Sequence, residues 1–189
     1  MSVNATAKTL TLLACAALMT AAAPKKPAPA KPAPAHAAAA GRAEPAGGFD
    51  PRNPQNLITL LSQAGGKAQV ARQEDDAVLV SVTSTAADFS MQFAGCDARG
   101  RACRAVLFDN LADNKAGPTF AQLNAYNQTS ALCRGYEDKT GKPHVLFSML
   151  LFEGDTKARL AEQFRAWTGC IGEFRNFLKD PNAYLAAAP

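Results

Sequence analysis

Two central stretches of the chain alternate apolar and polar residues at the two-residue period of a β-strand. Their apolar positions are Val78, Val80, Val82, Phe89, Met91 and Phe93. Weaker strands are expected over residues 67–72 and 104–108, and their short connections favour an antiparallel meander. A further hairpin is predicted from strands over 131–137 and 144–152. Its loop is residues 138–142, in which Gly141 can adopt a positive φ.

Three helices are predicted around these strands. The first starts at Asn53 and Pro54 and stops at Gly65-Gly66, and the second runs from Gly117 to about residue 130. Asp155 or Thr156 caps the last helix, and Pro181 ends it. Its apolar stripe is Leu160, Phe164, Trp167, Ile171, Phe174 and Leu178. The order helix, meander, helix, hairpin, helix predicts an α+β domain, with an antiparallel β-sheet and flanking helices.

The second helix carries a polar anomaly. With Phe120 as the reference, the 100° helical step places Leu123, Asn124 and Asn127 on one side. Two asparagines are therefore predicted to face the core, where their amides need partners. The favoured interpretation is that they bind backbone groups of the adjoining strand. The alternative is a polar pocket under the helix for a small ligand, with Tyr126 between the two asparagines.

The last predicted strand is apolar on both faces. One face carries Val145, Phe147, Met149 and Leu151, and the other carries Leu146, Leu150 and Phe152. A sheet covered on one side only does not need both faces to be apolar. Either helices cover both faces, or Leu146, Leu150 and Phe152 form an interface with a partner.

The N-terminal region resembles an export signal followed by a spacer. Residues 1–23 contain one charge (Lys8), an apolar run and a small-residue stretch, as a cleavable signal peptide does. An uncleaved anchor, or a lipoprotein modified at Cys15, is less favoured. Residues 24–48 are rich in Pro, Ala and Lys, which predicts a disordered, extended spacer. The folded domain is then residues 49–189, and we expect a periplasmic or secreted protein with no stable membrane span after cleavage.

Charge argues against a nucleic-acid partner. Lys8 and the spacer account for the whole net charge of +4, so the predicted domain is neutral. A nucleic-acid-binding face is usually strongly basic.

Four cysteines lie beyond the leader: Cys96, Cys103, Cys133 and Cys170. In an exported protein such cysteines are typically disulfide-bonded. Cys96 and Cys103 flank a loop and could approach one another, and a Cys133–Cys170 bridge would tie hairpin to helix. Four cysteines nevertheless allow three connectivities, and the sequence does not choose among them. No Cys-x-x-Cys motif and no paired spacing of metal ligands is present.

No catalytic motif is found. His144 is the only histidine of the predicted domain, and no nucleophile pattern accompanies it. We expect no enzymatic activity, no cofactor and no metal.

The order of several motifs resembles the YbjN family of bacterial proteins, which are described as sensory transduction regulators. The motifs are Asn124-Ala-Tyr126-Asn127, the strand from Cys133 to Tyr136, the 138–142 loop, Glu153-Gly154-Asp155-Thr156, and the helix with Trp167 and Phe174. The resemblance implies a fold like that of secretion chaperones, usually dimeric. The signal, the spacer and the cysteines depart from the family and indicate an exported variant.

Together these features predict a non-enzymatic, chaperone-like or regulatory protein of the bacterial cell envelope. It would act through a protein–protein interface, with a homodimer as one form. The alternative function is a small-ligand sensor with a polar pocket near the second helix.

Overall fold

A computed structural model describes residues 48–112 and 117–188. It contains one six-stranded antiparallel sheet with strand order β1-β2-β3-β4-β6-β5. The strands are β1 (Lys67–Gln73), β2 (Ala77–Thr83), β3 (Phe89–Ala94), β4 (Ala105–Leu111), β5 (Arg134–Glu137) and β6 (Pro143–Leu150). The helices are α1 (Pro54–Gln63), α2 (Phe120–Thr129), α3 (Lys157–Lys179) and α4 (Pro181–Ala187). The predicted α+β class is confirmed.

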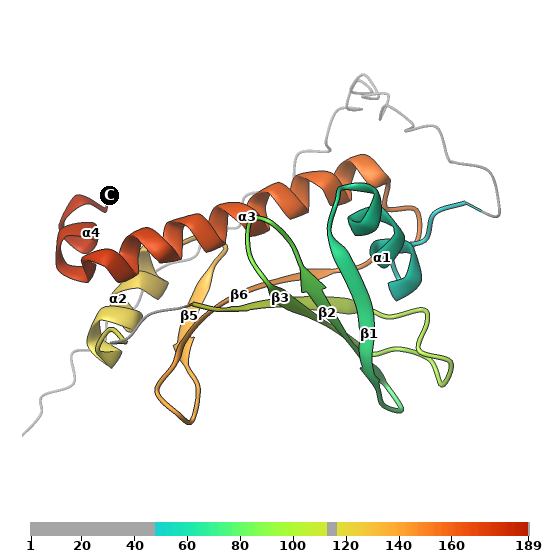
Figure 1. The fold of residues 1–189 in the computed structure, drawn as a ribbon, viewed down its shortest axis with the longest axis horizontal. Coiled ribbons are helices and arrows are strands. Elements are labelled where there is room, and N and C mark those ends of the chain that lie inside the picture. The colour runs from blue at the N-terminus through green and yellow to red at the C-terminus, as the bar shows by residue number, and fades with distance from the viewer. Residues whose placement is uncertain (1–47, 113–116, 189) are drawn as a thin grey trace, which may run out of the picture. The chain divides into compact units, whose positions relative to one another are not determined.

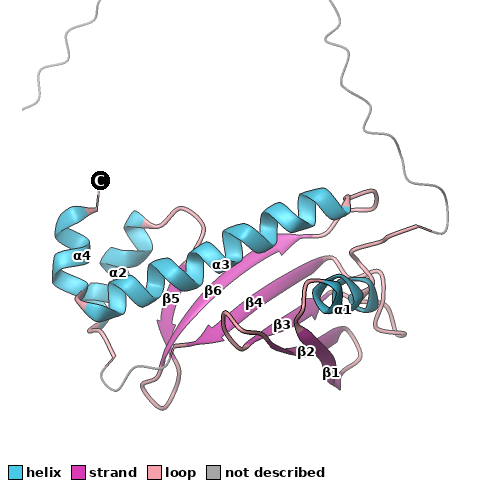
Figure 2. Cartoon of the chain, turned by 45° about the horizontal axis from the view of Figure 1, so that its top comes forward, coloured by secondary structure: helices cyan, strands magenta, loops and turns pink. Residues whose placement is uncertain are grey.

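The helices all lie on one side of the sheet. The long α3 runs along it, with α1 near β1 at one end and α2 and α4 near β5 at the other (Figure 1; Figure 2). A Cβ placed on Gly135 of β5 would meet both Phe174 of α3 and Leu123 of α2, so these two helices cover the same face. Among the described residues, the opposite face of the sheet carries no helix. Of the two alternatives for the last strand, helix cover on both faces is therefore excluded over the described residues.

The core lies between the sheet and α3. Aromatic rings fill it: Trp167 packs 5.7 Å from Phe108, centroid to centroid, and Phe174 packs 5.2 Å from Tyr126. All four of these side chains are buried. Burial of large apolar surface of this kind is the main favourable contribution to folding. The predicted stripe of α3 is correct at its centre, but Phe177 is fully buried and Leu178 only partly.

Local signals place the ends of the helices. Asn53 caps α1 by accepting a hydrogen bond from the backbone N–H of Gln55, and Thr156 caps α3 through that of Arg159. Gly141 has a φ of +77° in the turn between β5 and β6. These predictions are confirmed because capping and turn chemistry depend only on neighbouring residues.

The C-terminus contains a helix that the sequence reasoning missed. Pro181 was expected only to end α3, yet it opens α4. Asp180 caps this helix by accepting a hydrogen bond from the backbone N–H of Ala183. Proline is favourable in the first helical turn because its fixed φ suits the helix and the N–H it lacks would be unpaired there. The predicted signal peptide and nearly all of the predicted spacer lie outside the described residues.

The edge strand β1 is exposed along almost its whole length. Its pairing with β2 shifts register between Val70 and Arg72. Bulges and charged side chains on an edge strand discourage edge-to-edge pairing with other chains. Lys67 and Arg72 supply such charges, so this edge is poorly suited to extend the sheet.

Candidate functional site

The four cysteines form two disulfide bonds in the structure. Cys96 pairs with Cys103 across the loop between β3 and β4, and Cys133 pairs with Cys170. The second bond joins the segment before β5 to the middle of α3, with 37 residues of sequence separation. The structure thus selects one of the three connectivities that the sequence left open. Disulfides of this kind are typical of an oxidising, extracytoplasmic compartment.

The candidate polar pocket under α2 has a different geometry from the one expected. Asn124 is exposed, so its predicted core-facing position is wrong. The reference residue Phe120 is itself 78% exposed, whereas Leu123 and Tyr126 are buried. The true apolar face of α2 is therefore rotated away from Asn124.

Asn127 is half-buried and serves the neighbouring strand. Its Oδ1 accepts a hydrogen bond from the backbone N–H of Gly135 at 2.7 Å, and its Nδ2 donates to the Gly135 carbonyl at 3.0 Å. Both functions of the amide are therefore engaged by protein. Tyr126 lies among aromatic rings, and burial raises the pKa of its hydroxyl, with Glu173 adding to the effect. This arrangement agrees with the structural interpretation and offers no free amide to a ligand there.

We call the side of the sheet opposite the helices the open face. It carries the outward side chains of every second residue, such as Leu107 and Asp109 of β4 and Leu146 and Leu150 of β6. These alternate with buried positions such as Phe108 and Phe147. Leu146 is half-buried, and Leu150 is 61% exposed.

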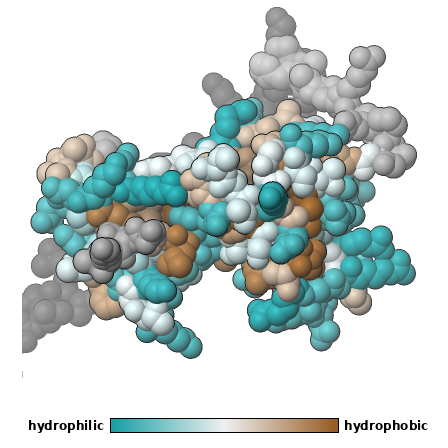
Figure 3. Space-filling view, viewed as in Figure 1, coloured by the Kyte–Doolittle hydropathy of each residue, from teal (hydrophilic) through white to brown (hydrophobic). Residues whose placement is uncertain are grey.

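Strand pairing arranges the open face in rows across the sheet. Leu150 lies opposite Ala105, which lies opposite Ala94, which lies opposite Ala77. The next row contains Leu79, Gln92, Leu107 and Ser148. Small and apolar side chains thus occupy one end of the face and leave it shallow. Figure 3 shows hydrophobic surface below α3 near both ends of the sheet, between hydrophilic side chains.

Phe152 does not continue this row. It follows the end of β6, and its ring lies 5.9 Å from the guanidinium carbon of Arg159 on α3. Its ring therefore lies near the start of α3, at the end of the sheet. It is about half exposed, so it borders the open face rather than forming its centre.

A polar network occupies the other end of the open face. The Asp109 carboxylate accepts a hydrogen bond from the Tyr136 hydroxyl at 2.6 Å and lies 2.7 Å from His144 Nδ1. The other ring nitrogen of His144 lies 3.7 Å from Asp138. Burial raises the pKa of Tyr136, and its hydrogen bond to Asp109 raises it further. The network was not predicted, because strand pairing brings these residues together from three separate segments.

The network orders the 138–142 turn rather than serving an evident nucleophile. The backbone N–H of Lys142, followed by the Thr140 hydroxyl, lowers the pKa of Asp138 to about 2. Ser148 shares the open face with His144 but lies four residues along the same strand, about 13 Å away at the rise of a β-strand. That separation is too large for the hydrogen bond that activates a serine.

Metal binding and membrane insertion each require a recognisable structural element. Among residues 48–112 and 117–188, no cluster of three or more His, Cys, Asp or Glu side chains is placed to hold a metal ion. Over the same residues, no helix combines the length and the apolar character that crossing a bilayer requires.

The sequence places the chain in a known family. The YbjN family model, described as "Putative bacterial sensory transduction regulator", matches residues 53–179. The chain therefore belongs to the YbjN family. That description is of a regulator and not of an enzyme. No curated protein and no solved structure matches the chain.

Proposed function

We propose that this YbjN protein is a non-enzymatic regulator that binds a protein partner through the open face of its sheet. The observation that carries the proposal is the uncovered face itself, on which Leu150 is 61% exposed beside a row of small side chains. An apolar strand face without a covering layer is energetically unfavourable in water. A partner that covered it would remove this cost.

The shape of the open face suits a broad protein surface. Ala77, Ala94 and Ala105 form a shallow row that ends at Leu150. Leu79 and Leu107 lie in the next row. Sheets pack face to face at about 10 Å through side chains of this kind. A small molecule would instead require a concave site that surrounds it.

A second copy of the chain is the partner that we propose first. Most soluble oligomers are symmetric, and a twofold axis brings the same patch of both copies together. The open face is apolar at one end and polar at the other, so two copies can pack their apolar ends together while both polar networks remain in water. The family resemblance also implies a dimer.

The proposed place of action is the periplasm or the extracellular space. The sequence of residues 1–23 has the three regions of a signal peptide, and both disulfide bonds require an oxidising environment to persist. We further propose that residues 24–48 act as a spacer. The regulatory role is then carried out in the cell envelope, by binding a protein partner in a chaperone-like way.

Sedimentation velocity on the purified chain tests the interface. The wild type is expected to dimerise at micromolar concentration, and Leu150→Asp is expected to be monomeric because it places a charge in the apolar end. Leu132→Asp is the matched control, since Leu132 is 59% exposed but lies outside the sheet. A dimer that survives Leu150→Asp contradicts the proposed interface, and a wild-type monomer excludes the second copy as partner.

A further inference from the structure

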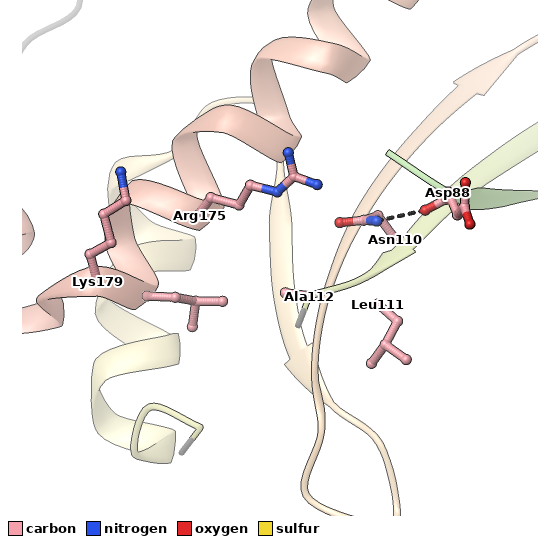
Figure 4. Close-up of a pocket in the computed structure, with 7 residues that line it drawn as sticks. Asp88, Asn110, Leu111, Ala112, Arg175 and Lys179 are labelled. Atoms are coloured by element: carbon pink, nitrogen blue, oxygen red, sulfur yellow. Dashed lines mark hydrogen bonds between the residues drawn. The ribbon is translucent and has the colours of Figure 1, made fainter. Parts of the chain in front are cut away.

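A hollow of about 450 Å³ lies on the helix side of the sheet, between the end of β4 and the C-terminal half of α3. Asp88, Asn110, Leu111, Ala112, Arg175 and Lys179 are among the residues that line it (Figure 4). The hollow is separate from the open face and from the amides of α2. Its volume is in the range of sites that hold small molecules.

Asn110 is the unusual residue of this hollow. It continues the buried series Val106 and Phe108 of β4, where an apolar residue is expected, and it is only 3% exposed. Its Nδ2 donates to the Asp88 carbonyl at 2.7 Å, which fixes the orientation of the amide because a carbonyl can only accept.

The Asn110 Oδ1 atom is buried and has no hydrogen-bond partner among the described residues. Figure 4 shows this oxygen pointing away from Asp88, toward the side of the hollow from which Arg175 extends. Buried acceptors in native proteins nearly always have a partner. An unpaired acceptor that faces a hollow is therefore suited to a ligand with an N–H or O–H group.

Arg175 provides the complementary charge. Its guanidinium extends from α3 toward Asn110 (Figure 4), and one of its nitrogens donates to the Ala86 carbonyl at 3.2 Å. A guanidinium has five N–H donors in a planar fork that matches a carboxylate. Lys179, which donates to Asn176 at 3.2 Å, adds a second positive charge, and Asp88 adds a negative one. Two cations and one carboxylate give the lining a net charge of +1, which fits a single negative charge better than a doubly charged phosphate.

We propose that this hollow binds a small carboxylic acid with an amine or hydroxyl next to the carboxylate, an α-amino or α-hydroxy acid. The carboxylate pairs with Arg175, and the amine or hydroxyl donates to Asn110 Oδ1. Ala112, on the same side of the chain as Asn110, lines the part of the hollow that takes the side chain of the ligand. The inference goes beyond partner binding and does not depend on the open face.

Isothermal titration calorimetry on the full, disulfide-bonded chain tests the assignment with four matched probes. L-leucine and 2-hydroxy-4-methylpentanoate carry both groups, and we expect them to bind with dissociation constants between about 10 μM and 1 mM. 4-Methylpentanoate lacks the donor, and leucinamide lacks the carboxylate. Each is expected to bind at least about tenfold more weakly, because one protein group is left unpaired. Preference between the first two probes identifies the ligand as an amino acid or a hydroxy acid.

Two variants assign the roles of the residues. Arg175→Gln, at an exposed position, is expected to reduce affinity at least about tenfold for both full probes. Asn110→Leu is expected to abolish the advantage of leucine over 4-methylpentanoate. Arg165→Gln, an exposed arginine elsewhere on α3, is the control and keeps wild-type affinity.

The proposal is overturned if neither full probe binds at about 10 mM, or if Arg175→Gln binds both as the wild type does. Should Asn110→Leu fail to fold, Arg175→Gln and the comparison of probes still decide the matter. Leu150→Asp is expected to leave ligand affinity unchanged, so failure here is distinguishable from failure of the proposed interface.

Discussion

Replacing Asn127 by alanine tests how the edge of the sheet is closed. β5 is the last strand of the sheet, and the Asn127 amide gives Gly135 the two hydrogen bonds that a further strand would supply. Alanine removes both bonds and leaves the backbone N–H and C=O of Gly135 with no side-chain partner from α2. Gly135 is itself buried, so water reaches these groups poorly.

The magnitude follows from two opposing contributions. Each hydrogen bond contributes about 0.5–1.5 kcal/mol to the free energy of unfolding, so the loss of two costs about 1–3 kcal/mol. Alanine also has a better helix propensity than asparagine, by roughly 0.6 kcal/mol. We therefore expect Asn127→Ala to lower the free energy of unfolding by about 0.5–2.5 kcal/mol.

Asn124→Ala is the matched control for this change. It makes the same substitution one turn away in the same helix, at an exposed side chain, and so carries the propensity gain alone. We expect it to match or slightly exceed the wild type in stability. The difference between the two variants isolates the hydrogen bonds to Gly135 and is expected to be about 1–3 kcal/mol.

Urea denaturation measures the difference. Trp167 is the only tryptophan of the chain and is fully buried, so its fluorescence reports unfolding. Both variants must show the same dependence on urea as the wild type for the comparison to hold. If the two variants are equally stable within about 0.5 kcal/mol, the paired amide is not a stabilising feature and the reasoning is refuted.

Three further outcomes are expected. Gly135→Ala should lower the free energy of unfolding, measured by urea denaturation, by about 1–3 kcal/mol. The reason is that the new Cβ would lie 2.7 Å from the Phe174 ring. Unchanged stability would contradict this packing. Cys170→Ala removes the disulfide bond to Cys133, which closes a loop with a sequence separation of 37 residues. Its loss should lower the free energy of unfolding by about 4 kcal/mol, and a loss below about 1 kcal/mol would argue against that bond. The pKa of Asp138 is lowered to about 2, so its ionised form stabilises the fold above about pH 4, and this contribution is lost as the pH falls toward 2. Asp138→Asn should lose less stability than the wild type over that pH range, and identical pH profiles would be inconsistent with the shift.

The sequence predicts the elements well where local chemistry determines them. The cap of α1 at Asn53 and the turn at Gly141 each depend on residues close in the chain. The orientation of α2 was wrong because the helix is short and weakly amphipathic, and Phe120 was taken as a buried anchor. Taking the exposed Phe120 as a buried reference rotates the inferred buried face around the axis of the helix. At 100° per residue, this rotation is enough to place Asn124 on that face.

Features that depend on strand pairing could not be predicted from the sequence. The network of Asp109, Tyr136 and His144 needs the register of β4, β6 and β5, which no local pattern specifies. Asn110 was passed over because β4 was expected to end at residue 108, whereas it reaches Leu111. Its signal was available as a polar residue at an apolar position of the alternation. The two-sided character of β6, in contrast, was readable and pointed to the open face.

Photo-crosslinking in living cells tests the central claim most directly. A photoreactive residue replaces Ser148, which is exposed at the middle of the open face between Leu146 and Leu150. Thr168, exposed on α3 on the other side of the molecule, is the matched control position. We expect ultraviolet light to give a defined crosslinked species from position 148, and to give it neither from position 168 nor after Leu150→Asp is added. Equal crosslinking from both positions, or a product that persists with Leu150→Asp, would contradict the assignment of the open face as the binding surface.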